Sequence, residues 1–239
     1  MNMLKYIILF LPVLLFADNK KMHDEDPKNR PHNTLGFGVL GSVYINDDQI
    51  FIGQTGSTLN NGSIFIYSKS DDGKIDKDQI FPPIVGTVEH DFGFSISVDG
   101  NSMVVGAPSR AGNGVGRAFI YQRKASREWV LKKEIVPDSS TWTTDFGSKV
   151  VIEDNLILIG DRYARNEDGM VYALYFNKNL GNWIKINSIW TDQIVSHGLF
   201  GHDIDIYQNR AIIGSRDGNI AIEYLFDSSS LNWVSRQVF

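Results

Sequence analysis

The chain has 239 residues, no cysteine, and 23 Lys and Arg against 28 Asp and Glu, which gives a net charge of −5. The absence of cysteine excludes a disulfide framework, a thiolate metal site and a cysteine nucleophile. The acidic balance gives no reason to expect a nucleic-acid partner, because nucleic-acid recognition requires clustered Lys and Arg.

The N-terminus has the pattern of a secretory signal. Met1 to Lys5 carries one positive charge, residues 6–16 are almost all apolar, and Ala17 precedes a charged Asp18. This pattern predicts a signal peptide over residues 1–17. Its apolar run is shorter than the roughly 20 residues that a membrane-spanning helix needs. We therefore expect a secreted, periplasmic or cell-surface protein that does not span a membrane after cleavage; a retained anchor is the alternative. Residues 18–34 mix charges with two prolines and predict a flexible charged leader.

The rest of the chain, residues 35–239, is a fourfold repeat. Four Phe-Gly pairs are spaced 55, 54 and 54 residues apart, and four glycines that end short apolar runs are spaced 53, 54 and 54 apart. Such periods are typical of repeat architectures. The repeats cover about 35–85, 86–138, 139–191 and 192–239. The pairs are Phe37-Gly38, Phe92-Gly93, Phe146-Gly147 and Phe200-Gly201, and the closing glycines are Gly53, Gly106, Gly160 and Gly214.

The second repeat predicts four short strands. Residues 92–98 alternate between apolar and small side chains, residues 103–105 form an apolar run, and residues 118–121 and 129–135 form two further strands. The other repeats fit the same template, although the first begins irregularly. A turn residue that tolerates positive φ stands five positions before each closing glycine, which favours a tight hairpin. These turn residues are Asp48, Asn101, Asn155 and Asn209.

A single four-stranded sheet cannot bury both of its faces, so the four sheets must pack against one another. A radial array achieves this and leaves only short edges. The sequence therefore predicts an all-β protein, a β-propeller of four-stranded antiparallel blades. Four blades either close into a ring or form a partial ring, and a partial ring would favour a homodimer.

Phe92-Gly93 followed by Gly106-Ala107-Pro108 resembles the FG-GAP repeat of integrin α-subunit propellers, and the resemblance covers residues 35–239. Only the second repeat has the full Gly-Ala-Pro. The resemblance implies an exported, non-enzymatic propeller that binds a protein or glycan partner through its blade loops, with cell adhesion as one role. Many members hold calcium in an Asp-rich loop between the first two strands of a blade. The corresponding turns here are too short and too poor in oxygen ligands, so we expect no metal and no cofactor.

Arginines in the loops between the second and third strands are the candidate ligand-binding residues. These loops emerge at the same end of a propeller, where guanidinium groups can hold a carboxylate, sulfate or phosphate. The alternative is local pairing with the aspartates of the same end, Asp91, Asp145, Asp161 and Asp217. The candidates are Arg110, Arg162, Tyr163, Arg165 and Arg216.

The sequence supports three further hypotheses, on an alternative function, on His202 and on glycosylation. Propellers can hold catalytic groups over their channel, so the alternative function is a secreted hydrolase or lyase acting on polysaccharide or phosphoester; no catalytic residue is identified. His202 falls on a strand position that faces inward, where we expect a packing role. Asn61 begins an Asn-Gly-Ser glycosylation acceptor, which matters only in a eukaryotic source.

Overall fold

The structure is a computed structural model, and it describes residues 40–46, 48–55, 62–69, 73–80, 91–109, 114–137, 145–193 and 197–239. Its contacts divide the chain into Met1–Leu35 and Gly36–Phe239, and all the described residues belong to the second unit. The signal peptide, the leader, the Phe37-Gly38 pair, Asn61 and Arg110 lie outside the described residues. The described part of the chain contains no helix that is long and apolar enough to cross a membrane.

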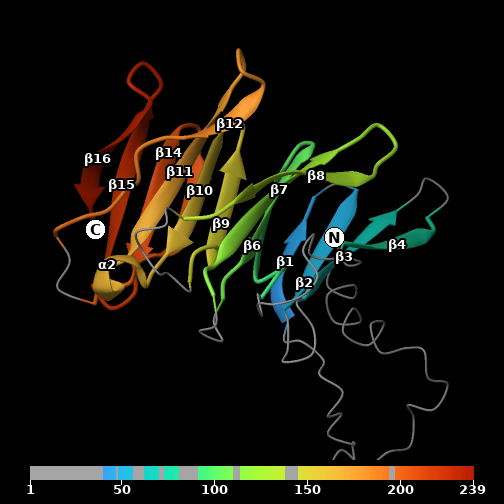
Figure 1. Cartoon of the computed structure of the whole chain (residues 1–239), viewed down its shortest axis with the longest axis horizontal. Coiled ribbons are helices and arrows are strands. Elements are labelled where there is room, and N and C mark those ends of the chain that lie inside the picture. The colour runs from blue at the N-terminus through green and yellow to red at the C-terminus, as the bar shows by residue number, and fades with distance from the viewer. Residues whose placement is uncertain are drawn as a thin grey trace, which may run out of the picture. The chain divides into compact units, whose positions relative to one another are not determined.

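The described chain forms four four-stranded sheets, in each of which the strands follow the order of the sequence (Figure 1). All neighbouring strands are antiparallel. We call the sheets blades 1 to 4. Blade 1 contains β1 (Leu40–Ile45), β2 (Gln49–Gln54), β3 (Ser63–Lys69) and β4 (Ile75–Ile80), and blade 2 contains β5 (Ser95–Asp99), β6 (Ser102–Ala107), β7 (Arg117–Arg123) and β8 (Trp129–Ile135). Blade 3 contains β9 (Lys149–Glu153), β10 (Leu156–Asp161), β11 (Met170–Asn177) and β12 (Asn182–Lys185), and blade 4 contains β13 (Phe200–Tyr207), β14 (Arg210–Ser215), β15 (Ile220–Asp227) and β16 (Asn232–Val238). The prediction of an all-β propeller built from four-stranded blades is confirmed.

The second and fourth strands of blade 2 match their sequence pattern closely. The apolar run Met103–Val105 lies in β6 and is fully buried, as expected of a strand covered on both faces. The predicted fourth strand, Trp129–Ile135, coincides with β8. The first strand is shorter than its alternation suggested, because β5 begins at Ser95 and Phe92 makes only an isolated bridge to Gly62.

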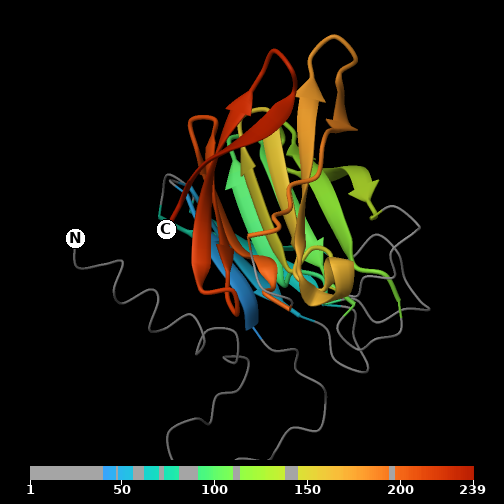
Figure 2. The ribbon, with the colours of Figure 1, turned by 90° about the vertical axis from the view of Figure 1, so that its left-hand side faces the viewer.

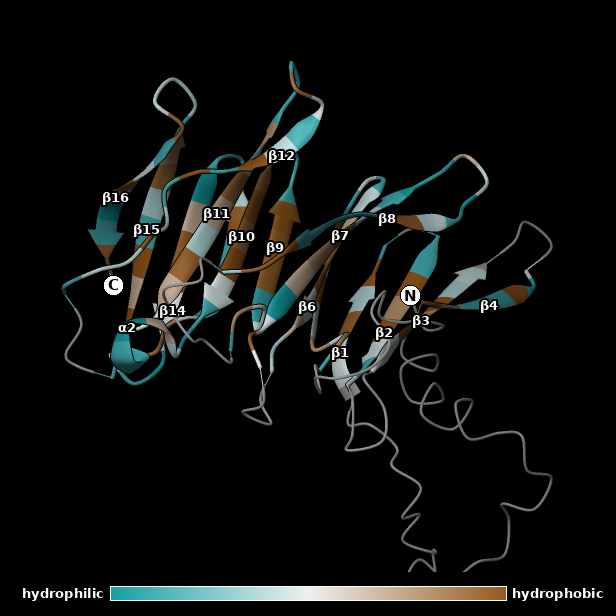
Figure 3. Cartoon of the chain, in the orientation of Figure 1, coloured by the Kyte–Doolittle hydropathy of each residue, from teal (hydrophilic) through white to brown (hydrophobic). Residues whose placement is uncertain are grey.

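The hydrophobic core consists of three clusters, one between each pair of successive blades. One cluster joins blades 1 and 2, a second joins blades 2 and 3, and a third joins blades 3 and 4. Figure 3 shows the corresponding gradient, with hydrophobic residues on inner strands such as β9 and β10 and hydrophilic residues on the outermost strand β16. Each sheet therefore buries its faces against its neighbours in the chain, as sheets packed in layers do.

The two glycine markers of the repeat meet at each interface between blades. A Cβ added to Gly53 would overlap the carbonyl oxygen of Gly93 in the next blade, and the same overlap joins Gly106 to Gly147. Gly160 meets Gly201 in the same way. The described Phe-Gly glycines, Gly93, Gly147 and Gly201, also have positive φ, between 85° and 91°, a conformation that glycine adopts without steric cost. The glycines therefore recur about every 54 residues because each interface between blades contains a close backbone contact that only glycine permits.

The phenylalanines of the markers complete these interfaces. Phe92, Phe146 and Phe200 are fully buried. The ring of Phe92 lies edge-on to those of Phe119 and Tyr121, with centroid distances of 5.5 and 6.4 Å. Edge-to-face pairs of this kind add about 0.5–1.5 kcal/mol each to the burial of the rings.

Side chains of one blade also cap the innermost strand of the next. The hydroxyls of Ser95 and Ser97 in β5 accept hydrogen bonds from the backbone N–H groups of Val150 and Ile152 in β9, at 2.9 and 3.1 Å. Asp99 accepts a third, from the N–H of Asp154 at 2.6 Å. The inner edge of β9, which would otherwise lack partners, is therefore satisfied by the preceding blade.

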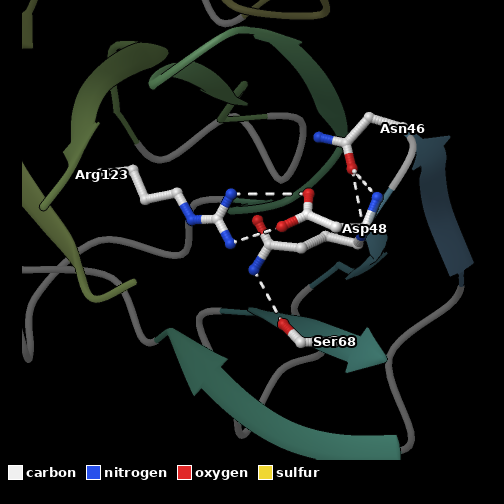
Figure 4. A network of polar contacts seen from close by, with 5 residues as sticks. Asn46, Asp48, Ser68 and Arg123 are labelled. Carbon is white, nitrogen blue, oxygen red and sulfur yellow. Dashed lines mark hydrogen bonds and ion pairs between the residues drawn. The ribbon is translucent and has the colours of Figure 1, made fainter. Parts of the chain in front are cut away.

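An ion pair ties blades 1 and 2 together near the β1–β2 turn (Figure 4). The Arg123 guanidinium donates to both carboxylate oxygens of Asp48, at 3.5 and 2.9 Å. The Asn46 side chain accepts from the backbone N–H groups of Asp48 and Gln49, at 3.3 and 2.8 Å. This Asx turn positions the Asp48 carboxylate for Arg123.

The expected hairpins are present, but positive φ falls mostly one residue earlier than expected. Gly100, Asp154 and Gln208 have φ of 53°, 51° and 47°, and only Asn209 of the marked positions has positive φ, at 60°. In blade 1 the turn is formed by the Asn46 side chain instead.

The four blades follow one another in a row, with blade 4 at one end and blade 1 at the other (Figures 1 and 2). Successive blades pack through their first strands, β1 on β5, β5 on β9 and β9 on β13. Among the described residues, blades 1 and 4 share no packed interface comparable with these. Among the described strands, the array is a propeller segment in which each end blade has one face without a neighbouring blade.

Candidate functional site

The loops of blades 3 and 4 are joined into one surface by backbone hydrogen bonds. The N–H groups of Leu199 and Phe200 donate to the carbonyls of Glu167 and Asp168, both at 3.0 Å. The N–H of Gly218 donates to the carbonyl of Gly198 at 3.2 Å. We call residues 162–169, 190, 197–199 and 215–218 the blade 3–4 loop face. Its β10–β11 segment, which contains α2 (Ala164–Glu167), lies at the lower end of the blades in Figure 1.

The backbone of this surface is held in left-handed conformations. Within α2, Arg165 and Asn166 have φ of 56° and 59° with ψ of 43° and 47°, and Glu167 has φ of 70°. The contacting residues His197 and Leu199 have φ of 65° and 56°. Such conformations cost L-residues about 1–2 kcal/mol each. Strain of this kind clusters at ligand-binding and active sites, where the surrounding structure holds it in place.

Arg162 belongs to the interior of this surface. Its Nε and Nη2 donate to the two carboxylate oxygens of Asp145, at 2.5 and 3.2 Å, and the Asp145 side chain is completely buried. Burial alone would lower the pKa of Arg162, but the hydrogen bond and charge of Asp145 outweigh it and the pKa is raised. Arg162 is therefore a positively charged partner of a buried carboxylate.

Arg216 occupies the equivalent position in blade 4 but has a different partner. Where blade 3 has Asp145, blade 4 has Leu199, so no buried carboxylate is available. Arg216 pairs instead with its neighbour Asp217, at 2.7 and 3.2 Å, and both side chains are about half exposed. The hydrogen bond from Arg216 lowers the pKa of Asp217, so the carboxylate stays ionised. Exposed pairs of this kind contribute about 0–1 kcal/mol and exchange partners readily.

Exposed aromatic rings accompany the arginines. Tyr163 is 44% exposed and Trp190 is 49% exposed. The guanidinium of Arg165 lies over the Trp190 ring, 4.1 Å from its centroid, and that of Arg162 lies 5.4 Å from the centroid of Tyr163. Among the described residues, Arg165 makes no ion pair with a carboxylate. Its charge is therefore available to an outside ligand.

His202 lies within electrostatic range of both Arg162 and Arg216. It is partly buried beside an irregularity in the β13–β14 pairing. Burial, followed by the positive charges of Arg162 and Arg216, lowers the pKa of His202, so the imidazole is neutral at neutral pH. The structure thus places it at the junction of the packed interior and the loops rather than wholly in the core.

Of the five residues that the sequence nominated, four lie in this region and Arg110 lies outside the described residues. Tyr163, Arg165 and Arg216 reach the surface, whereas Arg162 is engaged in the buried ion pair. Trp190 was not nominated. Its signal was available, because it stands apart from the tryptophans that begin the fourth strands, Trp129, Trp183 and Trp233.

In the described part of the chain, no group of three or more His, Asp or Glu side chains converges closely enough to hold a metal ion. A hollow of about 230 Å³ lies elsewhere, on the open face of blade 4, beside Tyr207, Ile212 and Phe239.

Comparison with known proteins adds little. No protein-family model matches the sequence, and no curated protein sequence matches it. One solved structure to which the chain is similar is the crystal structure of a Bacteroides fragilis protein described as a 6-phosphogluconolactonase. The two share 11% sequence identity with a TM-score of 0.45, over 82% of this chain and 69% of the other. At this level of similarity neither fold nor activity is inferred from the match.

Proposed function

We propose that this chain is an exported, non-enzymatic propeller of the FG-GAP type that binds a protein or glycan partner through the blade 3–4 loop face. Adhesion to a surface that displays acidic groups is the role that fits it best. The resemblance of the repeat to integrin-type propellers and the predicted signal peptide support export and binding.

The observation that carries the proposal is the combination of residues on two loops that contact each other. Tyr163 and Trp190 are exposed, Arg165 is stacked on Trp190, and residues 165–167 have left-handed backbone conformations. Trp, Tyr and Arg are the residue types that contribute most of the binding energy at interfaces. A surface that exposes all three on a rigid, strained backbone is suited to binding because little further ordering is required.

The charges of Arg216 and Arg165 determine which chemical groups on a partner this surface can bind. Arg216 sits in a weak exposed pair, and Arg165 has no carboxylate partner among the described residues. Guanidinium groups bind carboxylate and sulfate through two parallel hydrogen bonds. We therefore expect an acidic partner, and Asp217 would release Arg216 when a second anion binds it.

Binding is measured with two anionic probes, a heparin oligosaccharide and poly-L-glutamate, by isothermal titration at low salt. The double variant Arg165→Ser/Arg216→Ser should weaken binding at least tenfold, because each charged contact contributes about 1.5–3 kcal/mol. Trp190→Ala should also weaken it, because the stacked Arg165 loses its support.

The matched control is Arg236→Ser, which removes an exposed arginine from β16, outside the loop face. It should leave binding unchanged. Equal losses in the double variant and in Arg236→Ser would show that binding depends only on net charge, and would refute the assignment of the site.

A further inference from the structure

The open face of blade 1 is chemically the same as faces that are buried elsewhere in the chain. Cross-strand partners share a face, so the register places Val43 beside Ile52 and Phe65, and Ile45 beside Ile50 and Tyr67. Val43 and Ile45, on the first strand of this face, are 72% and 51% exposed, whereas Ile52 on the second strand is 4% exposed. The equivalent residues of blade 2 are all buried in the cluster between blades 1 and 2; they are Ile96, Val98, Met103, Val105, Phe119 and Tyr121.

The surfaces that cover such faces inside the chain share two features. Each is the opposite face of the preceding blade, and each has a closing glycine against which the next blade's carbonyl rests. Between blades 2 and 3 there are two more: a small residue, Ala118, beside the closing glycine Gly106, and the acceptors Ser95 and Ser97 for the next inner strand. A partner for blade 1 should have these features.

The open face of blade 4 has them. Gly214 is the fourth closing glycine, yet a Cβ there would meet only Asp203 of the same blade, at 3.7 and 4.0 Å. Ala221 pairs with Gly214 as Ala118 pairs with Gly106. Nothing within blade 4 requires glycine at position 214, because neither a close backbone contact nor a positive φ is present there.

Hydrogen-bond acceptors are also in place on blade 4. Asp203 and Asp205 occupy the positions of Ser95 and Ser97, two blades further along the repeat. Among the described residues, each accepts from the backbone N–H of the following residue, and Asp203 also accepts from Lys149. The N–H groups that they would meet in a next blade are those of Val43 and Ile45.

We propose that two copies of this chain assemble head to tail, with blade 4 of one copy packed against blade 1 of the other, to form a closed ring of eight blades. The two faces lie at opposite ends of the row, so a second copy presents them in the required order (Figure 1). Eight blades is within the range that propellers adopt. A head-to-tail interface that closes after two copies gives a finite ring rather than a filament.

Charge and shape favour this pairing over like-with-like contacts. The open face of blade 4 carries Asp205, together with Asp203, which pairs with Lys149, and Glu223, which pairs with Arg210. Lys77 stands on the open face of blade 1, over the ring of Phe65. Two blade 4 faces would bring two Asp205 carboxylates together. Two blade 1 faces would bury the apolar side chains but would leave glycine at position 214 without a role.

The test is the mass of the full chain in solution by size-exclusion chromatography with light scattering. We expect twice the chain mass of 26.9 kDa. Gly214→Val adds a side chain where one copy has room, so the variant should keep its melting temperature and become monomeric. The matched control Gly106→Val places the same side chain against the Gly147 carbonyl within the chain and should destabilise the fold itself.

Ile45→Asp places a charge on the open face of blade 1, which is the other side of the proposed interface, and should also give a monomer. Mixing Ile45→Asp with Gly214→Val should restore a dimer. The unchanged blade 4 face of the first variant can still pack against the unchanged blade 1 face of the second. Three results would overturn the proposal. A monomeric wild type that Gly214→Val destabilises indicates closure within one chain. A dimer that Gly214→Val leaves intact indicates pairing of blade 1 faces, and a monomer unaffected by both variants indicates two solvated faces.

Discussion

The two arginines at equivalent positions of blades 3 and 4 should differ sharply in their contribution to stability. Arg162→Ser removes the partner of Asp145, whose side chain is fully buried, whereas Arg162 itself is 14% exposed. Removing one member of a buried pair leaves a buried charge uncompensated and costs about 3–5 kcal/mol. For a domain of this size each kcal/mol lowers the melting temperature by about 2–4 °C, so we expect a decrease of roughly 6–20 °C.

Arg216→Ser removes only the exposed pair with Asp217 and should cost about 0–1 kcal/mol. Both variants are measured by thermal unfolding followed by circular dichroism and by urea titration. Asp145→Leu, introduced into the Arg162→Ser variant, copies the Leu199 of blade 4 and should recover part of the loss because the buried charge is gone. Equal effects of the two arginine variants would refute the distinction between a structural and an available arginine.

Three further predictions concern the packing of the blades and pH. Ser97→Ala removes the acceptor of the Ile152 N–H and should lower the free energy of unfolding, measured in urea, by about 1–3 kcal/mol. No change would show that water replaces the hydroxyl. Trp183→Ala empties a buried position against Phe176, 5.3 Å away between ring centroids, and should cost about 3–5 kcal/mol, whereas a loss below 1 kcal/mol would contradict its assignment to the core. The lowered pKa of His202 means that the unfolded chain binds the proton more readily, so stability should fall as pH decreases through the unfolded value of 6.5, and His202→Gln should flatten that fall. An unchanged pH dependence in His202→Gln would show that other groups cause it.

The fold could be predicted from the sequence because the repeated glycines mark a close backbone contact between successive blades. Gly106 lies against the Gly147 carbonyl, and no other residue fits there, so the glycine recurs wherever a blade follows. Strand β8 was predicted to the residue, from Trp129 to Ile135. Alternation was less reliable for β5, because the bridge and turn around Phe92 and Gly93 interrupt the ladder without breaking the apolar pattern.

The candidate site was only partly accessible. Repeat equivalence located Arg162 and Arg216, but their roles depend on whether position 145 or its equivalent carries a carboxylate, and the contact becomes evident only in three dimensions. The left-handed turn at Arg165 and Asn166 has no sequence signature, since arginine rarely adopts this conformation. Trp190 lies outside the strand template, and its contact with Arg165 joins two loops that the periodicity does not align.

The most direct test of the proposed binding surface is hydrogen–deuterium exchange of the chain with and without saturating heparin oligosaccharide or poly-L-glutamate. We expect protection confined to peptides that cover residues 162–169, 190, 197–199 and 215–218, and loss of that protection in Arg165→Ser/Arg216→Ser. Protection on the outer strands, such as β4 or β8, with none on these loops would contradict it.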